Sequence, residues 1–157
     1  PARDMDMGAI AAAFVEAGEP FAACARELAV LKNADVNGYL KGFIDLVFRR
    51  DGQYRILDWK SNWLGPDIGH YTPNAMHRAM CSHGYYLQGC IYALAFRRGM
   101  RQRVQGWDYE RDFGGIHYVF LRGVSSGDAG SGVVSYFPPA SLLDAMERAL
   151  GCERGNV

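Results

Sequence analysis

The sequence predicts a mixed α/β domain whose sheet is not purely parallel. Three observations support this prediction. Alanine-rich helical segments open the chain, an Asp-Gly pair separates two runs of β-branched and aromatic residues, and helical segments are followed by two more strand-like runs. A chain of 157 residues is long enough for one domain and short for two. We therefore expect residues 1–157 to form a single domain.

The N-terminal part of the chain favours two helices. Residues 5–17 and 20–31 are rich in alanine, and Gly18-Glu19-Pro20 separates them. The longest apolar run there, Ala9 to Val15, is far shorter than the roughly 20 residues that a membrane-spanning helix needs. We therefore expect no membrane association. Because the chain opens with Pro rather than Met, we also expect it to be a fragment of a longer protein.

A β-hairpin is expected next. Residues 39–48 and 54–59 are strand-like, and Asp51-Gly52 lies between them, which is the strongest short-range signal for a two-residue hairpin turn. With such a turn Arg50 faces Gln53, and every other cross-strand pair follows by counting outward. This register determines which side chains share a face.

The elements after the hairpin follow from turn residues, caps and periodicity. In chain order we expect a loop over 61–71, a helix from Pro73 to about Ser82 capped by Thr72, a helix over 85–104 with Leu87, Ile91 and Leu94 on its buried face, a strand over 116–121, a Gly/Ser-rich loop over 123–132, a strand over 133–137 and a helix over 139–150.

The hairpin register places two carboxylates opposite each other. Asp45 faces Asp58 on one side of the hairpin, with Cβ atoms about 4.5–5.5 Å apart, and alternation puts Lys60 on the same side. Opposed like charges are destabilising unless a cation lies between them, and oxygen ligands of this kind suit Mg²⁺ or Mn²⁺. A lysine beside such a metal can orient water or stabilise charge in phosphate-ester hydrolysis.

Two alternatives remain open at this point. A solvated hairpin face can carry two aspartates and a lysine without any function, and a bulge at Gly52 would separate the acidic pair. The overall charge does not decide the matter, because 17 basic and 17 acidic residues give a net charge of zero and exclude only a uniformly basic nucleic-acid-binding surface.

Basic residues gather in one place, at the end of the helix expected over 85–104. Cations there either complement the helix dipole or hold DNA phosphates, and both interpretations are kept. The residues concerned are Arg97, Arg98, Arg101 and Arg103.

The cysteines and histidines do not show the close spacing of a metal site. For the cysteines we expect free thiols in a reducing compartment, and for the histidines ordinary exposed or core roles. These residues are Cys24, Cys81, Cys90, Cys152, His70, His77, His83 and His117.

Several ordered motifs resemble those of one nuclease family. The segments 42–47 and 57–62, followed by Gln88 and Tyr92, resemble the RecB-type branch of the PD-(D/E)XK nucleases, and the resemblance extends over roughly residues 37–124. It rests also on Tyr85-Tyr86-Leu87-Gln88 and on the run from Phe113 to Gly123. The resemblance implies a restriction-endonuclease-like α/β fold, with a mixed sheet and flanking helices.

The resemblance also implies an activity and partners. It predicts a cytoplasmic, Mg²⁺-dependent exodeoxyribonuclease V-type nuclease, with Mn²⁺ or Ca²⁺ able to replace Mg²⁺ in binding, joined to a helicase motor in a RecBCD-type complex for recombinational repair of double-strand breaks. The implied partners are DNA, the sister subunits RecC and RecD, and the recombinase RecA. The alternative function is a docking or regulatory module that contacts sister subunits or RecA without cutting DNA.

Roles for individual residues follow from the family motif. The resemblance assigns metal binding to Asp45 and Asp58, a further ligand to the backbone carbonyl of Trp59, and assistance to the attacking water to Lys60. It places Gln88 and Tyr92 beside the site, in agreement with their i,i+4 spacing on one helical face. The alternative for these two is that they cap the polar edge of a packed helix.

One part of the family pattern has no match here. An upstream helix of the family supplies a further metal ligand, a His or a Glu, and no stretch of this chain matches it. We expect the chain to begin after that helix. We therefore expect weak Mg²⁺ affinity and little or no nuclease activity from the chain alone.

Overall fold

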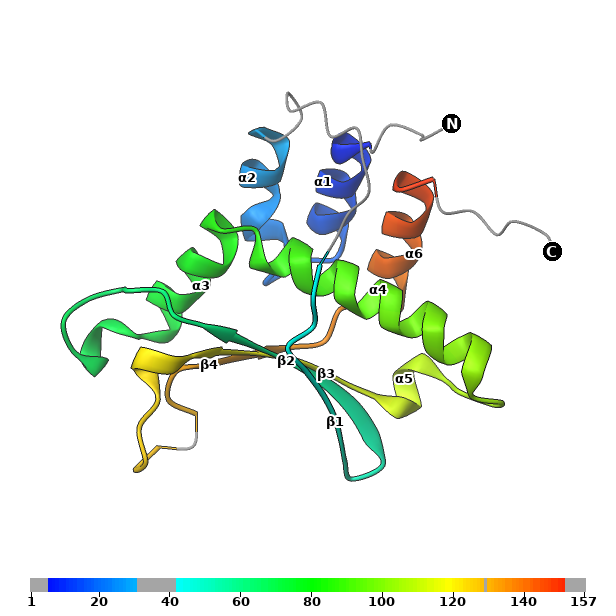
Figure 1. Ribbon diagram of the computed structural model, residues 1–157. Helices are drawn as coiled ribbons and strands as arrows, with labels where there is room; N and C mark the ends of the chain where they lie inside the picture. The colour runs from blue at the N-terminus through cyan, green and yellow to red at the C-terminus, as the bar shows by residue number, and fades with distance from the viewer. Residues whose placement is uncertain (1–5, 31–41, 129, 152–157) are drawn as a thin grey trace.

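The computed structural model describes residues 6–30, 42–128 and 130–151, and it confirms the mixed α/β architecture (Figure 1). Four strands form one sheet in the order β1-β2-β3-β4. The outer pairs are antiparallel, whereas β2 and β3 are parallel. The strands are β1 (Leu46–Arg50), β2 (Gln53–Lys60), β3 (Phe113–Phe120) and β4 (Val133–Tyr136).

The helices lie close to the ranges that the sequence predicts. Thr72 caps α3 through a hydrogen bond that its side chain accepts from the Ala75 N–H, as expected. The short α5 was not anticipated, because four residues are too few to show a helical period. The helices are α1 (Met7–Glu16), α2 (Ala25–Val30), α3 (Pro73–Ser82), α4 (Tyr85–Arg103), α5 (Tyr109–Asp112) and α6 (Ala140–Ala149), with 3₁₀ turns η1 (Ala22–Cys24), η3 (Ile68–His70) and η4 (Leu121–Gly123).

The described helices are stacked on one face of the sheet. Figure 1 shows α4 crossing the sheet, with α1, α2 and α6 beyond it. The core fills the space between these layers, and Phe14, Ile56 and Leu143 are among its fully buried residues. No described helix covers the opposite face, where Leu46 is 42% exposed and Trp59 46% exposed. The side chains of β2 therefore divide into a buried set facing α4 and a more exposed set.

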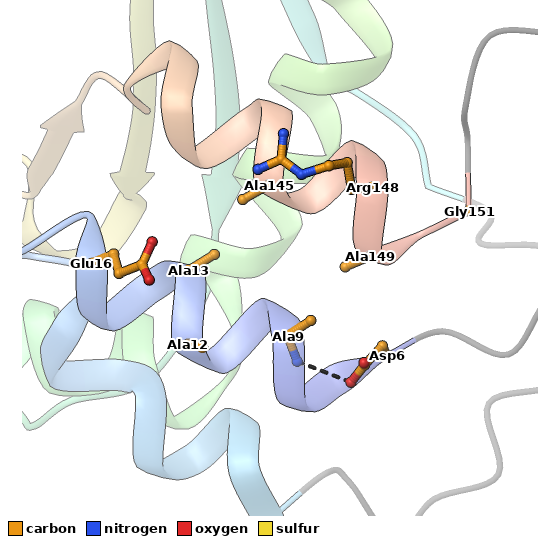
Figure 2. A pocket seen from close by; sticks show the side chains of 9 residues that line it. All are labelled: Asp6, Ala9, Ala12, Ala13, Glu16, Ala145, Arg148, Ala149 and Gly151. Carbon is orange, nitrogen blue, oxygen red and sulfur yellow. Dashed lines mark hydrogen bonds between the residues drawn. The ribbon is translucent and has the colours of Figure 1, made fainter.

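A hollow of about 520 Å³ lies in the helix layer, between α1 and α6. Figure 2 shows Glu16 of α1 and Arg148 of α6 beside it. Most of the other lining side chains are small, which explains the space between the two helices: Ala9, Ala12, Ala13, Ala145 and Ala149. None of the lining residues belongs to the hairpin.

The hairpin has the predicted register but a later start. Arg50 pairs with Gln53, and the ladder runs to Leu46 opposite Leu57. Both turn residues have positive φ, 52° at Asp51 and 81° at Gly52, as a tight hairpin turn requires. The first strand was expected over 39–48, but β1 covers 46–50 and residues 39–41 lie outside the described ranges. The ladder ends there because the Asp45 carboxylate accepts the N–H of Trp59 at 2.9 Å.

The expectation of free thiols is wrong for two cysteines. A disulfide joins Cys24 and Cys81, whose Cα atoms are 4.8 Å apart, within the usual range for such a bond. It links η1 to α3 across 57 positions of sequence, and spacing along the chain does not reveal proximity of that kind. Cys90 is a buried free thiol whose pKa is raised by burial, and Cys152 lies outside the described residues.

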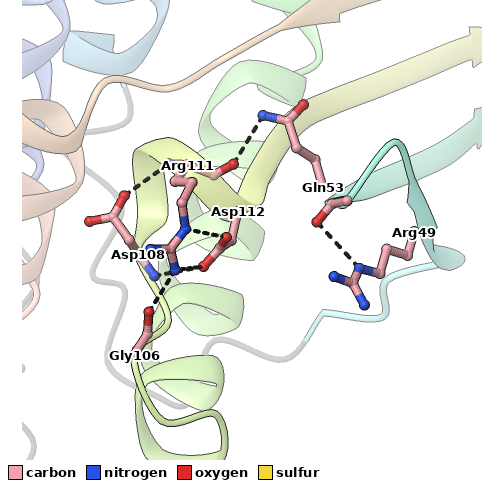
Figure 3. A network of polar contacts seen from close by, with 7 residues as sticks. Arg49, Gln53, Gly106, Asp108, Arg111 and Asp112 are labelled. Carbon is pink, nitrogen blue, oxygen red and sulfur yellow. Dashed lines mark hydrogen bonds and ion pairs between the residues drawn. The ribbon is translucent and has the colours of Figure 1, made fainter.

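A polar network connects α5 to the start of β2 (Figure 3). The Gln53 side chain donates to the Arg111 carbonyl at 3.2 Å, and the Arg111 guanidinium contacts both oxygens of Asp112 at 2.7 Å. These hydrogen bonds from Arg111, followed by one from the Asp108 N–H, lower the pKa of Asp112 to about 2. The network holds α5 against the hairpin.

Close packing of α4 on the sheet depends on Gly89. A Cβ at this position would overlap the Tyr136 hydroxyl and lie 3.1 Å from Cδ1 of Ile116. We expect Gly89→Ala to lower the free energy of unfolding by about 1–3 kcal/mol, because overpacking exceeds the gain in helix propensity. Urea denaturation measures the difference.

Gly99, on the same helix, is the matched control. A Cβ there would meet only the end of the flexible Arg103 side chain, at 2.8 Å. We expect Gly99→Ala to raise the free energy of unfolding by about 0.5–1 kcal/mol through helix propensity. Equal effects of the two substitutions would contradict the packing of α4 described above.

His117 makes stability depend on pH. It lies on β3, where its Nδ1 is 2.7 Å from Oγ of Ser135. Burial, followed by the nearby charge of Arg55, lowers the pKa of His117 from its ordinary 6.5. The unfolded chain therefore binds a proton first as the pH falls. The stability due to neutral His117 is complete above pH 6.5 and is lost between 6.5 and the lower folded-state pKa.

This predicts a difference between the wild type and His117→Gln. Urea denaturation from pH 8 to pH 5 should show a steeper loss of stability in the wild type, within the window below about 6.5. Parallel curves would show that protonation of His117 is not coupled to folding.

Candidate active site

Asp58 and Lys60 lie on the buried face of β2, toward α4. Asp58 is 3% exposed, and the Lys60 side chain is 11% exposed. The Lys60 Nζ lies 2.5 Å from Oδ1 of Asp58. Residues two apart on a strand point to the same side, so this ion pair follows from the D-x-K spacing. The predicted neighbourhood of these two residues is present in the fold.

Asp45 lies directly before β1 and is exposed. Its Oδ2 accepts the Trp59 N–H, which brings its carboxylate to the end of β2. A strand residue directs its N–H and C=O toward the same neighbouring strand, so the Trp59 carbonyl also points toward the side of Asp45. The Asp45 carboxylate and this carbonyl therefore lie on the same side of the end of β2, next to Asp58 in the sequence.

The pKa of Asp58 depends on its burial and on two charged neighbours, Lys60 and Asp45. Burial raises the pKa of Asp58 above its ordinary 3.8, and the charge of Asp45 raises it further, while Lys60 lowers it. The raised pKa means that Lys60 only partly offsets the cost of burying the carboxylate. A second cation at this site would stabilise the ionised form.

Helix α4 contributes the two residues that the i,i+4 spacing indicated. The Gln88 Oε1 accepts a hydrogen bond from Lys60 Nζ at 3.0 Å, and the Tyr92 hydroxyl donates to the Phe43 carbonyl at 2.7 Å. Burial raises the pKa of Tyr92, and the charges of Asp58 and Asp45 add to that effect. Tyr92 is therefore close to both acids, and Gln88 contacts the lysine directly.

Two tyrosines of the site were not found by the sequence reasoning. Lys60 Nζ lies 3.9 Å from the ring centroid of Tyr85 and 5.0 Å from that of Tyr118. The Tyr118 hydroxyl also donates to Gln88 Oε1 at 3.0 Å. Tyr85 could have been considered, since it lies three positions before Gln88 on the same helix. Tyr118 gives no local signal, because it reaches Asp58 only through the pairing of β2 with β3.

The arginines at the end of α4 differ from one another. Arg97 is fully buried, and its guanidinium pairs with Asp144 at 2.7 Å and Glu147 at 3.1 Å, both on α6. We therefore correct the expectation that Arg97 contacts DNA, because a side chain without exposed surface cannot reach a phosphate in this fold. The Arg98 side chain is 43% exposed and lies 3.6 Å from Glu147, so a contact with DNA remains a prediction.

An arginine outside that cluster lies beside the end of β2. Arg122, in the η4 turn after β3, is exposed, and its Nε donates to the Ser61 carbonyl at 3.3 Å. This contact holds a guanidinium beside the residue that follows Lys60. Its position suits a contact with substrate phosphate, and sequence reasoning did not single it out.

The donor set suits a hard divalent cation. Oδ1 of Asp58 is a buried oxygen whose ion-pair partner is the Lys60 ammonium, and the Asp45 carboxylate and the Trp59 carbonyl add further oxygen donors. Oxygen donors at one or two carboxylates are typical of Mg²⁺ sites that keep several waters. Within the described ranges no group of three or more His, Cys, Asp or Glu side chains could hold a metal. A metal held here would be bound by few protein ligands.

Comparison with known proteins supports the resemblance to a nuclease family. A family model described as the PD-(D/E)XK nuclease superfamily matches residues 6–151. The RecBCD enzyme subunit RecB of Escherichia coli (strain K12) is 49% identical over 117 residues, which cover 74% of this chain and 10% of that protein. The subunit of the same name from Haemophilus influenzae is 39% identical over 117 residues, covering 74% of this chain and 10% of that protein.

A more distant relative aligns over nearly the whole chain. The RecBCD enzyme subunit RecB of Mycolicibacterium smegmatis is 33% identical over 165 aligned residues, which cover 97% of this chain and 15% of that protein. The chain thus spans only 10 to 15% of the length of these three relatives. The similarity applies to the region that carries Asp45, Asp58 and Lys60.

Proposed function

Because the chain belongs to the PD-(D/E)XK nuclease superfamily, as a RecB-like nuclease domain, we propose that it hydrolyses DNA phosphodiester bonds with Mg²⁺ as its cofactor. One observation supports this function above the others. The Asp45 carboxylate accepts the N–H of Trp59, the residue that follows Asp58, and the Lys60 ammonium lies 2.5 Å from Oδ1 of Asp58. Carboxylate oxygens beside a lysine suit metal-assisted hydrolysis of a phosphate ester.

Each residue of the site has a distinct role in the proposed reaction. Asp45, Asp58 and the Trp59 carbonyl would hold the cation, which, when bound, would polarise the phosphate and lower the pKa of a coordinated water. Lys60 would donate a hydrogen bond to the attacking water or to a phosphate oxygen as negative charge develops there. Gln88 holds Lys60 through its side-chain oxygen. Hydrolysis by water requires no covalent enzyme intermediate.

The wider role is proposed from the relatives. Their name, RecBCD enzyme subunit RecB, supports a place for this domain in a RecBCD-type helicase-nuclease that acts in recombinational repair of double-strand breaks. We therefore propose DNA, subunits of the RecC and RecD type, and RecA as its partners.

We propose a cytoplasmic location for this domain, because bacterial DNA, its proposed substrate, lies in the cytoplasm. The described residues include no helix that is long and apolar enough to cross a membrane. The Cys24–Cys81 disulfide is the one feature of the described residues that does not favour this location, because disulfides are uncommon in cytoplasmic proteins.

The activity of the chain by itself is proposed to be low. The described residues bring two carboxylates together, and a site with so few protein ligands binds Mg²⁺ weakly. We therefore expect little cleavage of DNA by the chain alone. Activity is better measured after this chain replaces the matching 117 residues of the Escherichia coli relative, to which it is 49% identical.

Metal binding tests the proposal directly. Mn²⁺ is titrated into the metal-free chain, and bound Mn²⁺ is followed by electron paramagnetic resonance. We expect a saturable site that Asp45→Asn and Asp58→Asn each weaken at least about tenfold, as loss of a supporting group of a metal site typically does. Asp51→Asn is the matched control, because Asp51 is an exposed carboxylate in the hairpin turn, and we expect it to leave binding unchanged.

The exchanged protein, in which this chain replaces the matching segment of the Escherichia coli relative, completes the test. In this protein Asp58→Asn should abolish the Mg²⁺-dependent cleavage of DNA. Unchanged metal binding in all three variants, together with unchanged cleavage, would refute the proposed site. Absence of metal binding by the unmutated chain, together with absence of cleavage by the unmutated exchanged protein, would instead favour the docking or regulatory module.

A further inference from the structure

We propose that Tyr85, Gln88 and Tyr118 form a cage that holds the Lys60 ammonium in place independently of Asp58. The Lys60 cage, as we call these three residues, would keep the lysine positioned while Asp58 is engaged by a cation. The inference rests on the proposed function of Asp58 as a metal ligand. Tyr85 and Tyr118 are then positioning residues, since they act on the reaction through Lys60.

The contacts of Lys60 support a cage rather than a simple ion pair. Its Nζ lies 3.9 Å from the centroid of the Tyr85 ring and 5.0 Å from that of Tyr118, within the range of cation–π attraction. Gln88 accepts a hydrogen bond from the same Nζ at 3.0 Å. Three groups other than Asp58 therefore contact the ammonium.

The cage is held by contacts of its own. Tyr118 is fully buried and stacks between Tyr85 and Tyr136, at centroid distances of 5.7 and 6.1 Å. The Tyr118 hydroxyl donates to the Gln88 oxygen, which directs that oxygen toward Lys60. The Tyr85 hydroxyl donates to the side-chain oxygen of Asn62 at 3.1 Å. None of these contacts involves Asp58.

The energetics explain why such a cage is useful. The Lys60 side chain is only 11% exposed, so its ammonium is poorly hydrated. A carboxylate that turns toward a divalent cation interacts less with the lysine, and a buried ammonium without partners is costly. Ring faces and a neutral amide oxygen stabilise the ammonium without competing for the cation, because they carry no negative charge. Lys60 thus stays beside the phosphate when Asp58 changes partner.

The cage predicts a spectroscopic signature that needs no cleavage activity. The chain has only three lysines, at positions 32, 41 and 60, so a ¹³C-lysine-labelled sample gives a simple spectrum in which Lys60→Arg assigns one signal. Protons above a ring face are shielded. We therefore expect the ε-CH₂ signal of Lys60 to lie upfield of a solvated lysine, and to remain there in Asp58→Asn.

Two tyrosine variants complete the experiment. Tyr85→Phe keeps the ring and should retain the upfield shift, whereas Tyr85→Leu removes the ring and should lose most of it. Thermal unfolding of each variant checks that it is folded, and Tyr85→Phe gives the result if Tyr85→Leu does not fold.

Several outcomes would overturn the proposal. They are a solvated position for Lys60 in the wild type, loss of the shift in Asp58→Asn or in Tyr85→Phe, and an unchanged shift in folded Tyr85→Leu. These results do not depend on metal binding or cleavage, so failure of the cage and failure of the proposed nuclease function are distinguishable.

Discussion

Lys60→Ala is expected to reduce Mg²⁺-dependent cleavage of DNA by about 10²- to 10³-fold, the range lost when one hydrogen-bond donor to a developing negative charge is removed. The substitution removes the cation nearest Asp58, at 2.5 Å, and leaves both carboxylates in place. Metal binding should therefore survive, and should even strengthen, because Lys60 no longer competes for the Asp58 carboxylate. Cleavage is measured after exchange of this chain into the Escherichia coli relative, and Mn²⁺ binding on the chain alone.

Comparing DNA cleavage with metal binding distinguishes the role of Lys60 from that of Asp58. Asp58→Asn should lose both metal binding and cleavage, whereas Lys60→Ala should lose cleavage alone. Equal loss of metal binding in the two variants would show that Lys60 only supports the structure of the site. Undiminished cleavage in Lys60→Ala would exclude the lysine from the chemistry.

Arg97→Ala is expected to lower the free energy of unfolding by about 2–5 kcal/mol, as truncation of a large, fully buried side chain typically does. The Arg97 guanidinium is fully buried and pairs with Asp144 at 2.7 Å and Glu147 at 3.1 Å. Its removal leaves a void between α4 and α6 and takes the shared cation from two carboxylates. Urea denaturation at neutral pH measures the change.

The neighbouring arginine provides the control. Arg98 also pairs with Glu147, but at 3.6 Å and with a side chain that is 43% exposed. We expect Arg98→Ala to change stability by less than about 1 kcal/mol, because exposed ion pairs contribute little. A similar cost for both substitutions would contradict a structural role that is specific to Arg97.

Local patterns predicted the parts of the fold that are encoded over a few residues. Asp51-Gly52 predicted the turn, and the turn predicted the register from Arg50 opposite Gln53 outward. The Thr72 cap predicted the start of α3. Each of these depends on backbone geometry and hydrogen bonds within a short segment, which the residue types themselves determine.

Local patterns failed where a residue's partner is distant in the chain. Arg97 had the appearance of an exposed cation at a helix end, but α6 covers it with two carboxylates about 50 residues later. Leu87 and Ile91 were expected on the buried face of α4 and are only half-buried, while Gly89 and Ala93 pack more deeply. The exposure of a helix face depends on what packs against it.

The sequence by itself determined that Asp58 and Lys60 share one face and that Gln88 and Tyr92 share another, because strand alternation and helical periodicity act within a single element. The register of the Asp51-Gly52 turn likewise placed Asp45 near Asp58. Only the tertiary structure decided that α4 lies over β2, so that Gln88 meets Lys60.

Tertiary packing also decided that Tyr118 contacts the same lysine and that Arg97 is buried. These contacts join segments tens of residues apart, and the packing of one element on another depends on the whole core rather than on any local motif. For that reason the proximity of Asp58 and Lys60 could be predicted from the sequence, whereas the contacts of Lys60 with Tyr85, Gln88 and Tyr118 required the fold.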